Sequence, residues 1–433
     1  MFSRRIAVVG AGYVGLTTSA CLASLGHSVV CADISVEKVE QLRSGRVTIL
    51  EPDLEKLLVE GMAAGRLEFA VGARDAVSVS DKPVEVLFLC VPTPMSASGA
   101  ADLGPVEAVV REVRDLLPSG CVIVNKSTVP VGTAEATRKL LGRKDVAVVS
   151  NPEFLREGSA VHDFLNPDRI VVGCDAQDAA EKVAALYSKL GAPAVLTDAA
   201  SAEMVKYAAN CFLSMKLSYV NALAELCERL GADVADVTEG MGYDRRIGQA
   251  FLQPGPGWGG SCLPKDTRAM LQVAAGVGLE FSLVAASLAT NDRQRTLMVD
   301  KIRDAVGGDL AGQQLGLLGL AFKAGTADLR GSPALAVAAE LHAQGAVLTG
   351  YDPGLTEGVP GVTDAVRVVD DPSMAAKDAA ALVVLTEWPE FRGLDWRALS
   401  SVVAQRVVVD TRNLLDPEVL RRAGFSWIGV GRR

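Results

Sequence analysis

Histidine is scarce in this chain of 433 residues, in which only His27, His162 and His342 occur. They stand far apart, and none has a metal-ligand spacing such as HxxxH or HExxH, so we expect no catalytic metal. The eight cysteines form neither a CxxC pair nor a dense disulfide framework. Seven of them lie in apolar segments typical of buried small side chains, whereas Cys262 lies between glycines and a proline.

Long hydrophobic runs and an excess of positive charge are also missing. No apolar run approaches the roughly 20 residues that a membrane-spanning helix needs. The first residues pass directly into a strand-like segment without a cleavage-site pattern, so we expect a cytoplasmic protein with no membrane partner. A formal net charge of −9 argues against nucleic acid as the main partner, although local basic side chains and helix N-termini can still bind phosphates.

Strand-like and helix-like segments alternate through the first 200 residues. Their apolar runs are continuous rather than alternating, which predicts a parallel sheet covered on both faces. The predicted strands are 6–10, 28–33, 84–91, 122–126, 146–150, 170–174 and 194–197.

Residues 201–230 contain neither proline nor glycine and predict a helix about 45 Å long. A second helical region, 267–306, is interrupted only at 276–278. Beyond this helical region, strands are predicted at 315–322, 346–351, 382–386 and 407–410, and a helix at 333–344. The sequence thus predicts an α/β fold with two Rossmann-like, doubly wound parallel-sheet domains and a central all-helical domain that contains a long spine helix. An exposed apolar stripe on this helix would favour a homodimer.

A glycine-rich turn follows the first strand and opens a helix. Gly10, Gly12 and Gly15 have the GxGxxG spacing that lets backbone approach a pyrophosphate. Asp33 closes the next strand, where a carboxylate accepts hydrogen bonds from ribose hydroxyls and repels a 2′-phosphate. This pattern predicts NAD rather than NADP. Lys38 weakly favours a phosphate ligand, and a solvated helix face explains it equally well.

Polar residues follow three later strands, where parallel sheets bind their ligands. Thr93 and Thr128 stand there and could line the cofactor, or they could belong to plain turns. Glu153 and Glu157 are four residues apart and share one face if the segment is helical. Glu153 could serve as a general base, and surface solvation is the alternative.

The strongest chemical signal is the sequence Gly259-Gly260-Ser261-Cys262-Leu263-Pro264-Lys265-Asp266. A cysteine in a glycine-rich loop can act as a nucleophile, and a thiol that binds the first product offers a route to a second oxidation. Asp266 could cap the following helix or take part in the chemistry. Lys206 and Asn210, four apart on the predicted long helix, could hold an oxyanion or a water, or could be ordinary helix residues.

Taken together, these motifs resemble the UDP-glucose/GDP-mannose dehydrogenase family. The resemblance covers nearly the whole chain and rests on GAGYVGL (10–16), KSTVPVGT (126–133), NPEFLREGSA (151–160), AEMVKYAAN (202–210), GWGGSCLPKD (257–266) and GLAFKAGTADLR (319–330).

The resemblance implies three domains. They are an NAD-binding Rossmann domain (1–199), a central helical dimerisation domain (200–306) and a C-terminal Rossmann-like domain that binds the sugar nucleotide (307–433). It also implies two NAD-dependent oxidations at the sugar C6, with Cys262 holding the aldehyde as a thiohemiacetal and then as a thioester.

The resemblance also assigns roles to single residues. The implied catalytic residues are Cys262 as the nucleophile, Glu153 as the base for thioester hydrolysis, Lys206 with Asn210 at the oxyanion, and Asp266 with Thr128 at a water. The implied NAD-binding residues are Gly10, Gly12, Tyr13, Val14, Gly15, Asp33, Lys38, Thr93, Thr128, Glu157, Lys265 and Arg330. The implied substrate-binding residues are Glu153, Phe154, Leu155, Lys206, Asn210, Arg246 (from across a dimer interface), Phe251, Gly257, Trp258, Gly259, Phe322, Lys323 and Arg412.

The sequence indicates the nucleotide base of the substrate less clearly than it indicates the family. Residues 167–173 and Arg246-Ile247-Gly248 are similar to the UDP-glucose branch of the family, whereas Leu263 and Lys323-Ala324-Gly325-Thr326 are similar to the GDP-mannose branch. We expect UDP-glucose, with a dTDP- or GDP-sugar as the alternative. Two other functions stay open, which are a 3-hydroxyacid-type dehydrogenase that makes one oxidation and a sugar-nucleotide sensor without activity.

Overall fold

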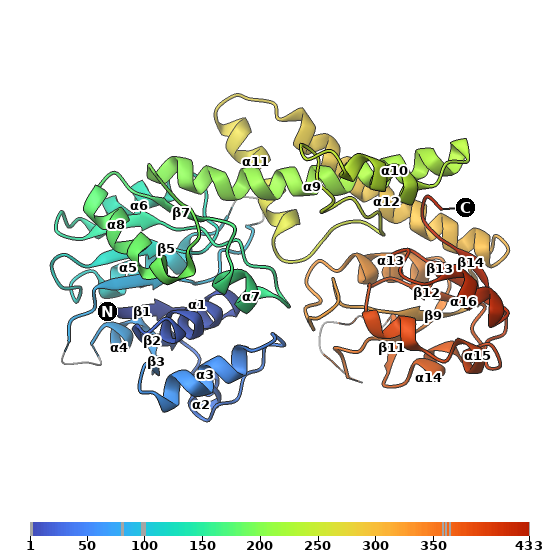
Figure 1. Ribbon diagram of the computed structural model, residues 1–433, viewed down its shortest axis with the longest axis horizontal. Helices are drawn as coiled ribbons and strands as arrows, with labels where there is room; N and C mark the ends of the chain where they lie inside the picture. Colours follow the sequence, from blue (N-terminus) through green and yellow to red (C-terminus); the bar gives the residue numbers. More distant parts are fainter. Residues whose placement is uncertain are drawn as a thin grey trace. The chain divides into compact units, whose positions relative to one another are not determined.

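The computed structural model describes residues 3–78, 82–96, 101–356, 359, 362 and 365–432. The chain divides into two compact units, one of residues 1–209 and 268–277 and the other of residues 210–267 and 278–433. Two helices belong to both units (Figure 1): α9 (Ala199–Leu230) begins in the first unit, and α11 (Leu263–Gly276) begins in the second. The division into three domains at 199/200 and 306/307 stays a prediction.

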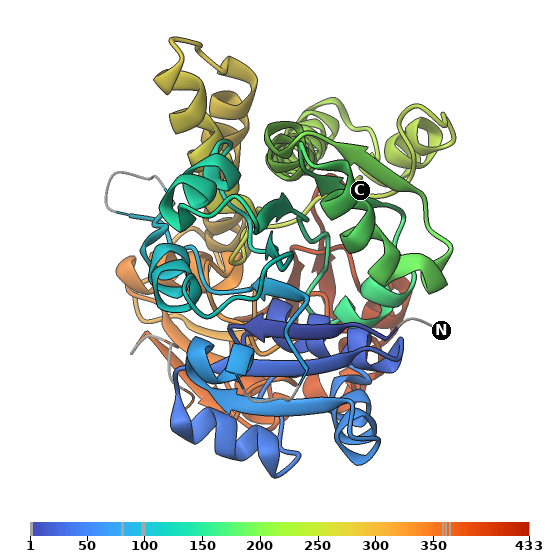
Figure 2. The same cartoon turned by 90° about the vertical axis from the view of Figure 1, so that its left-hand side faces the viewer.

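The first unit is built on an eight-stranded sheet with the order β3-β2-β1-β4-β5-β6-β7-β8. Its strands are β1 (Arg5–Val9), β2 (Ser28–Asp33), β3 (Leu67–Val71), β4 (Val86–Leu89), β5 (Val122–Asn125), β6 (Ala147–Ser150), β7 (Ile170–Gly173) and β8 (Ala194–Thr197). Its helices are α1 (Tyr13–Ser24), α2 (Val36–Arg43), α3 (Leu54–Ala63), α4 (Gly72–Ser78), α5 (Gly104–Val113), α6 (Thr133–Leu141), α7 (Ala160–Leu165), α8 (Gln177–Ala184) and the 3₁₀ helix η1 (Ala185–Leu190). The order of the first six strands is that of dinucleotide-binding sheets, and Figure 2 shows helices on both sides of these strands.

The second unit is built on a six-stranded parallel sheet with the order β11-β10-β9-β12-β13-β14, which repeats the same topology. Its strands are β9 (Gln314–Leu318), β10 (Val347–Tyr351), β11 (Val366–Val369), β12 (Ala381–Val384), β13 (Val407–Asp410) and β14 (Ser426–Ile428). Its helices are α10 (Val234–Gly242), α12 (Ser282–Ala305), α13 (Pro333–Ala343), α14 (Pro372–Ala376), α15 (Trp396–Leu399), α16 (Pro417–Arg422) and the 3₁₀ helix η2 (Pro389–Gly393). The predicted α/β class with two Rossmann-like sheets and a long helix is confirmed.

Two details of the prediction are wrong. The first sheet is not wholly parallel, because β7 pairs antiparallel with β6 through Ser150 and Gly173. Residues 151–159 form no helix, and the backbone of Gly158 and Ala160 donates to the Glu51 carboxylate before α7 leads into β7. The strand predicted at 315–322 already ends at Leu318, because Gly319 has φ +92° and its backbone lies against Thr386.

Three strands were not predicted, and their composition explains why. Glu68 and Arg367 interrupt the apolar runs of β3 and β11, and β14 has only three residues. Each of these strands pairs with a neighbour whose apolar run is longer, so the sheet rather than the local sequence fixes them.

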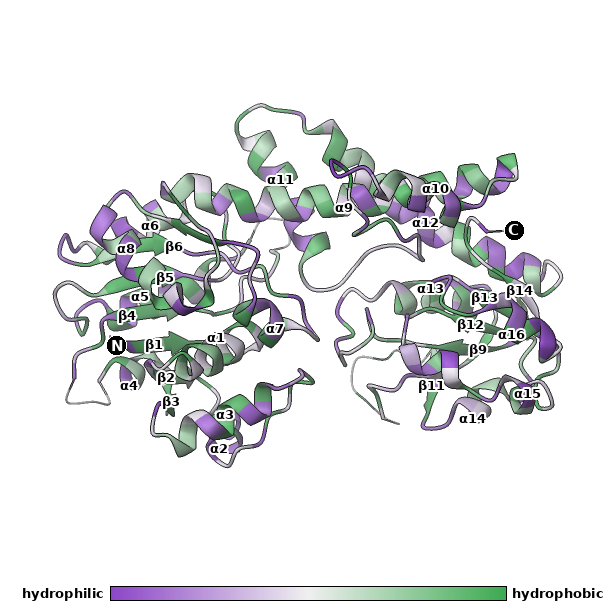
Figure 3. Ribbon diagram, viewed as in Figure 1, coloured by the Kyte–Doolittle hydropathy of each residue, from purple (hydrophilic) through white to green (hydrophobic). Residues whose placement is uncertain are grey.

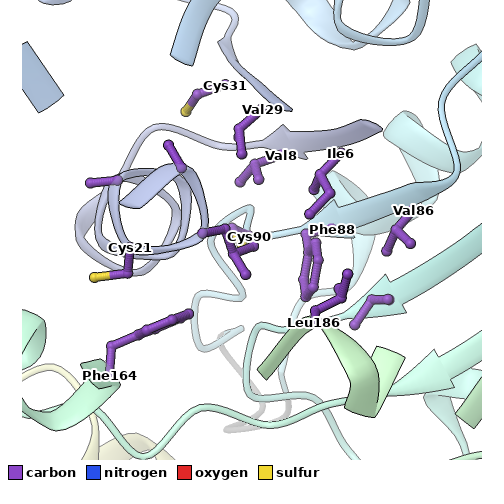
Figure 4. Packing of buried hydrophobic residues seen from close by; sticks show 14 of the residues in the cluster. Ile6, Val8, Cys21, Val29, Cys31, Val86, Phe88, Cys90, Phe164 and Leu186 are labelled. Atoms are coloured by element: carbon purple, nitrogen blue, oxygen red, sulfur yellow. The ribbon is translucent and has the colours of Figure 1, made fainter. Parts of the chain in front are cut away.

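Successive residues of the central strands face opposite sides of each sheet, and both sides are apolar. In β4, Val86 and Phe88 belong to one buried cluster, and Leu87 and Leu89 to the other. Figure 3 shows the strands of both sheets mostly in green, and Figure 4 shows Phe88 packed among Ile6, Val86 and Leu186. This two-sided burial is what parallel sheets with helices on both faces require.

No helix in the described part of the chain is long and apolar enough to cross a membrane.

Phe88 offers a test of this packing. Its side chain is fully buried in the central strand β4, so Phe88→Ala should lower the free energy of unfolding by about 3–5 kcal/mol. Denaturant unfolding of the variant measures this loss. The matched control is Val195→Ala on the edge strand β8, where the side chain is 46% exposed and the loss should stay below about 1 kcal/mol. Equal losses in the two variants would contradict the assignment of β4 to the core.

Candidate active site

The glycine-rich turn between β1 and α1 has room for a ligand at one glycine only. A Cβ at Gly10, which has φ +103°, would lie 2.6 Å from the Cys90 carbonyl oxygen, and one at Gly15 would lie 1.7 Å from the Gly10 carbonyl oxygen. A Cβ at Gly12 would meet nothing within 4 Å. Gly10 and Gly15 therefore pack the turn against the sheet, and Gly12 leaves open space at the start of the helix.

Asp33 closes β2 beside this turn, as the sequence predicts. Its carboxylate accepts from the backbone N–H of Ala11 and of Ser35, both at 3.0 Å, and from Lys38 Nζ at 3.1 Å. Burial alone would raise the pKa of Asp33, but these donors outweigh burial and lower it. The carboxylate is thus ionised at the place where a ribose would bind, and Lys38 pairs with it.

These residues fit a dinucleotide. No side chain caps the N-terminus of α1 at Gly12, and the first turn of the helix contains no acidic residue. Uncapped N–H groups at a helix N-terminus attract a phosphate. The site residues Tyr13 and Val14 belong to this first turn.

Thr93 and Thr128 follow neighbouring strands and are in contact. Thr93 Oγ1 donates to the Thr128 carbonyl oxygen at 2.8 Å, and Thr93 is buried. The two threonines thus belong to one structural feature at the carboxyl edge of β4 and β5, where parallel sheets bind ligands.

Glu153 and Lys206 form a buried ion pair in the first unit. Lys206 Nζ lies 2.9 Å from Glu153 Oε1, and both side chains are 6% exposed. The other carboxylate oxygen accepts from the backbone N–H of Leu155 at 2.6 Å. A buried ion pair holds its two members in one geometry, because losing either partner leaves an uncompensated charge.

The Phe154 ring lies close to two cations of the same unit. The Arg169 guanidinium is 3.5 Å from the centre of its ring, and Lys206 Nζ is 5.5 Å from it. The aromatic face thus helps to hold Lys206 in place.

Tyr13 links the glycine-rich turn to this group of charges. Burial, first, and the negative charges of Glu51, Glu153, Glu157 and Asp163 all raise the pKa of its phenol. Tyr13 is therefore neutral, and it lies within reach of the electrostatic field of both Glu153 and Glu157.

Lys126 and Glu203 are buried charged residues of the first unit that were not predicted as functional. Lys126, of the KSTVPVGT motif, donates from Nζ to Asn151 Oδ1 at 3.1 Å. Glu203, on α9, accepts from the backbone N–H of Gly132 and Ala134 at the start of α6 and from Ser150 Oγ. Glu203 stands three residues before Lys206 on the same helix, and this spacing is the sequence signal that could have identified Glu203 as a site residue.

Asn210 and Asp266 meet in the second unit. Asn210 Nδ2 donates to Asp266 Oδ2 at 2.5 Å, and Lys265 Nζ donates to Asp266 Oδ1 at 2.6 Å. Asp266 is completely buried in the first turn of α11. The carboxylate therefore does more than cap a helix, since it joins α9 to α11.

Cys262 directly precedes α11 and is exposed, whereas six of the other cysteines are buried and Cys174 is half-buried. Its Sγ lies 3.6 Å from Ser261 Oγ. A helix N-terminus favours a thiolate. In contrast, burial raises the pKa of the thiols of Cys21, Cys31, Cys121 and Cys211 to about 12.

The loop before Cys262 is fixed by side chains of α9 and α12. Trp258 is buried, its indole N–H donates to Ser218 Oγ at 2.9 Å, and its backbone exchanges two hydrogen bonds with Asn291. The Gly255 N–H donates to Asn221 Oδ1, and its carbonyl accepts from Gln294 Nε2, both at 2.8 Å. The buried Trp258 side chain therefore fixes the conformation of the loop.

The glycines of this loop pack against the start of α13 and the loop after β9. A Cβ at Gly259 would lie 2.0 Å from the Gly331 carbonyl oxygen, and one at Gly260 would lie 2.8 Å from the Phe322 ring. Gly257 has φ +118°, a conformation that side chains disfavour. Phe251, at the other end of the loop, also has a positive φ of 62°.

The predicted basic residues of the second unit differ in their surroundings. Lys323 Nζ lies 5.8 Å from the centre of the Phe322 ring. Arg412 donates to the Leu385 carbonyl and pairs with Glu387, and its guanidinium lies beside Gly255. Arg330 pairs with Asp328, and Arg246, whose side chain is 89% exposed, pairs with Asp244.

The described residues contain no group of three His, Cys, Asp or Glu side chains that could hold a metal ion.

Comparison with known proteins decides the family. Residues 4–191 match the NAD binding domain of the UDP-glucose/GDP-mannose dehydrogenase family, residues 200–293 its central domain and residues 316–417 its UDP binding domain. The chain belongs to this family. It is therefore an oxidoreductase whose cofactor is NAD, which the turn at Gly12 and the carboxylate of Asp33 fit.

Relatives within the family match the whole chain. The UDP-glucose 6-dehydrogenase of Rhizobium meliloti is 43% identical, with 99% of each chain covered, and the UDP-glucose 6-dehydrogenase TuaD of Bacillus subtilis is 42% identical, covering 99% of this chain and 93% of that protein. The solved structure of a UDP-glucose dehydrogenase from Pyrobaculum islandicum is similar with a TM-score of 0.89 and 38% identity, covering 100% of this chain and 98% of the other.

The exposure of Cys262 can be tested without any substrate. We expect one thiol per chain to react rapidly with 5,5′-dithiobis(2-nitrobenzoate) in the folded protein, because six of the other thiols are buried and Cys174 is half-buried. Cys262→Ser should remove this rapid phase, and Cys174→Ser, at the half-buried position, should leave it unchanged. A rapid phase that survives in Cys262→Ser would show that the reactive thiol lies elsewhere.

Proposed function

We propose that this chain oxidises UDP-glucose to UDP-glucuronate with two molecules of NAD per sugar. The observation that carries the proposal is the exposed Cys262, which directly precedes a helix in a glycine-rich loop of a chain whose other cysteines are buried or half-buried. Its relatives in Rhizobium meliloti and Bacillus subtilis, named as UDP-glucose 6-dehydrogenases, support the choice of substrate.

The oxidation would proceed through a covalent bond to the thiol. NAD would be held in the first unit by the turn at Gly12 and by Asp33, and it would supply the hydride acceptor for each oxidation. The C6 alcohol loses a hydride and a proton to give the aldehyde, and Cys262 Sγ adds to its carbonyl carbon to form a thiohemiacetal. Loss of a second hydride and proton leaves a thioester. Water then cleaves the carbon–sulfur bond, which gives the carboxylate, restores the thiol and releases a further proton.

The buried polar residues suit the steps that handle protons and oxyanions. Glu153 would accept a proton from the water that attacks the thioester. Lys206 would stabilise the oxyanion on the sugar carbon, with the Asn210 amide beside it. Asp266 and Thr128 would orient water. The ion pair between Glu153 and Lys206 supports these roles, because it keeps a carboxylate and an ammonium together at a low exposure.

The other cofactor and substrate residues are those that the family resemblance implies. NAD would be held by Gly10, Gly12, Tyr13, Val14, Gly15, Asp33, Lys38, Thr93, Thr128, Glu157, Lys265 and Arg330. The sugar nucleotide would be held by Phe154, Leu155, Arg246, Phe251, Gly257, Gly259, Phe322, Lys323 and Arg412. Trp258 would act through the shape of its loop, since its indole is buried and already bonded to Ser218.

We also infer a homodimer. Phe212, Tyr219 and Leu226 follow one another at seven-residue spacing on α9 and are 55%, 54% and 50% exposed. This spacing forms an apolar stripe along one side of a helix, which a second copy of the same helix can cover. Arg246 would then contribute to the site of the partner subunit.

The yield of NADH tests the proposed chemistry. We expect two NADH for each UDP-glucose consumed, because one thiol carries the sugar through both oxidations. Cys262→Ser should still bind UDP-glucose, measured by calorimetry, but should produce no NADH at steady state. A yield of one NADH would favour a single oxidation, and no NADH would favour a sensor. Parallel assays with dTDP-glucose and GDP-mannose decide the base, and a higher kcat/KM for either would overturn the choice of UDP-glucose.

A further inference from the structure

Lys126 lies inside the first unit rather than on its surface. It directly follows β5, and it is only 5% exposed. Its Nζ donates to Asn151 Oδ1 at 3.1 Å and to the Tyr187 hydroxyl at 3.4 Å, and lies 5.4 Å from the centre of the Tyr187 ring. In the described part of the chain, no carboxylate forms an ion pair with this ammonium.

A short chain of contacts connects Lys126 to Glu153. Asn151 is fixed on three sides, because its Oδ1 accepts from Lys126 and from the Tyr187 hydroxyl at 2.6 Å, and its Nδ2 donates to the Val171 carbonyl at 2.7 Å. Pro152 follows, and its ring restricts the backbone. Glu153 comes next, so the direction of its carboxylate depends on how Asn151 is held.

The charge of Lys126 also acts on the same group through space. The titratable groups around it are the Tyr187 phenol at 3.4 Å, the Cys90 thiol after β4, the Glu153 carboxylate after β6 and the Lys206 ammonium on α9. Burial lowers the pKa of Lys126 to about 8 and Lys206 acts in the same direction, whereas Cys90 and Glu153 oppose the shift. A buried ammonium is unfavourable, and an apolar side chain of similar length would fill the same space at less cost.

We propose that Lys126 is a positioning residue of the oxidation site, which holds the turn from Asn151 to Glu153 and supplies a second buried positive charge beside the ion pair of Glu153 and Lys206. This charge lies in the same buried group as the carboxylate that would accept a proton from water during thioester hydrolysis. The inference rests on the proposed function for its chemistry, and on the contacts of Lys126 alone for its buried charge.

The buried charge is tested by stability, without substrate. An ammonium with a lowered folded-state pKa destabilises the folded state below about pH 8, and this penalty disappears as the pH rises from about 8 towards 10.5. The melting temperature of Lys126→Met, relative to the unchanged chain, should therefore be higher at pH 7 than at pH 10. Lys144→Met, at an exposed lysine, is the control and should show a constant difference. A constant difference for Lys126→Met as well would overturn the inference.

The positioning role is tested by the pH dependence of turnover. Lys126→Met should lower kcat by about tenfold or more while KM for UDP-glucose changes little, because the loss falls on a proton transfer rather than on binding. The acidic limb of its kcat profile should move to higher pH, since Glu153 loses a neighbouring positive charge and binds a proton more readily. Lys126→Arg keeps the positive charge, so the acidic limb of its kcat profile should stay at the same pH as in the unchanged chain. If Lys126→Met does not fold, Lys126→Gln removes the charge and still offers a donor to Asn151.

Two outcomes separate this inference from the proposed function. A kcat and an acidic limb that stay unchanged in Lys126→Met or Lys126→Gln would refute the positioning role, even if the unchanged chain gives two NADH per UDP-glucose. An unchanged chain that does not oxidise UDP-glucose would refute the proposed function, and the comparison of melting temperatures would still decide whether Lys126 is a buried charge.

Discussion

Buried polar side chains need partners, and one face of α9 shows how this chain meets that need. Six buried polar residues follow one another on this helix three or four residues apart: Glu203, Lys206, Asn210, Ser214, Ser218 and Asn221. This is the spacing of one helical face. Within the first unit, Glu203 bonds to Ser150 and Lys206 to Glu153. Within the second unit, Asn210 bonds to Asp266, Ser218 to Trp258 and Asn221 to Gly255. Because an unsatisfied buried polar group is costly, each of these partners is held where the helix requires it.

The position of Cys262 follows from a different constraint, which is close backbone packing. Its loop has glycines where a side chain would collide with Gly331 or Phe322, and the loop is bonded through Trp258 and Gly255 to α9 and α12. A thiol that is exposed but carried on a rigid support can hold a substrate covalently without losing its position. The buried cysteines lack the exposure that such chemistry needs.

Sequence reasoning was most successful where a motif is local. The glycine-rich turn, Asp33 after the second strand and the isolated character of Cys262 could all be predicted, because each depends on neighbours a few residues away. The pairs of Lys206 with Glu153 and of Asn210 with Asp266 could not, because their members are 53 and 56 residues apart and only the fold brings them together. Lys126, the last residue of the strand predicted at 122–126, was overlooked for the same reason, since its partners Asn151 and Tyr187 lie 25 and 61 residues away. The segment before α7 and β7 bonds to Glu51, which lies 107 and 109 residues earlier in the chain, so no local pattern predicts its path or the reversed direction of β7.

In the proposed mechanism, Glu153 is the base and the sulfur of Cys262 carries the sugar. The most direct measurement is the intact mass of Glu153→Gln after incubation with UDP-glucose and NAD, followed by peptide mapping. We predict that this variant accumulates a UDP-glucuronyl thioester on the peptide that contains Cys262, because hydrolysis lacks its base, and that adding Cys262→Ser abolishes the adduct. A variant that turns over at full rate with no adduct on Cys262 would contradict the covalent route.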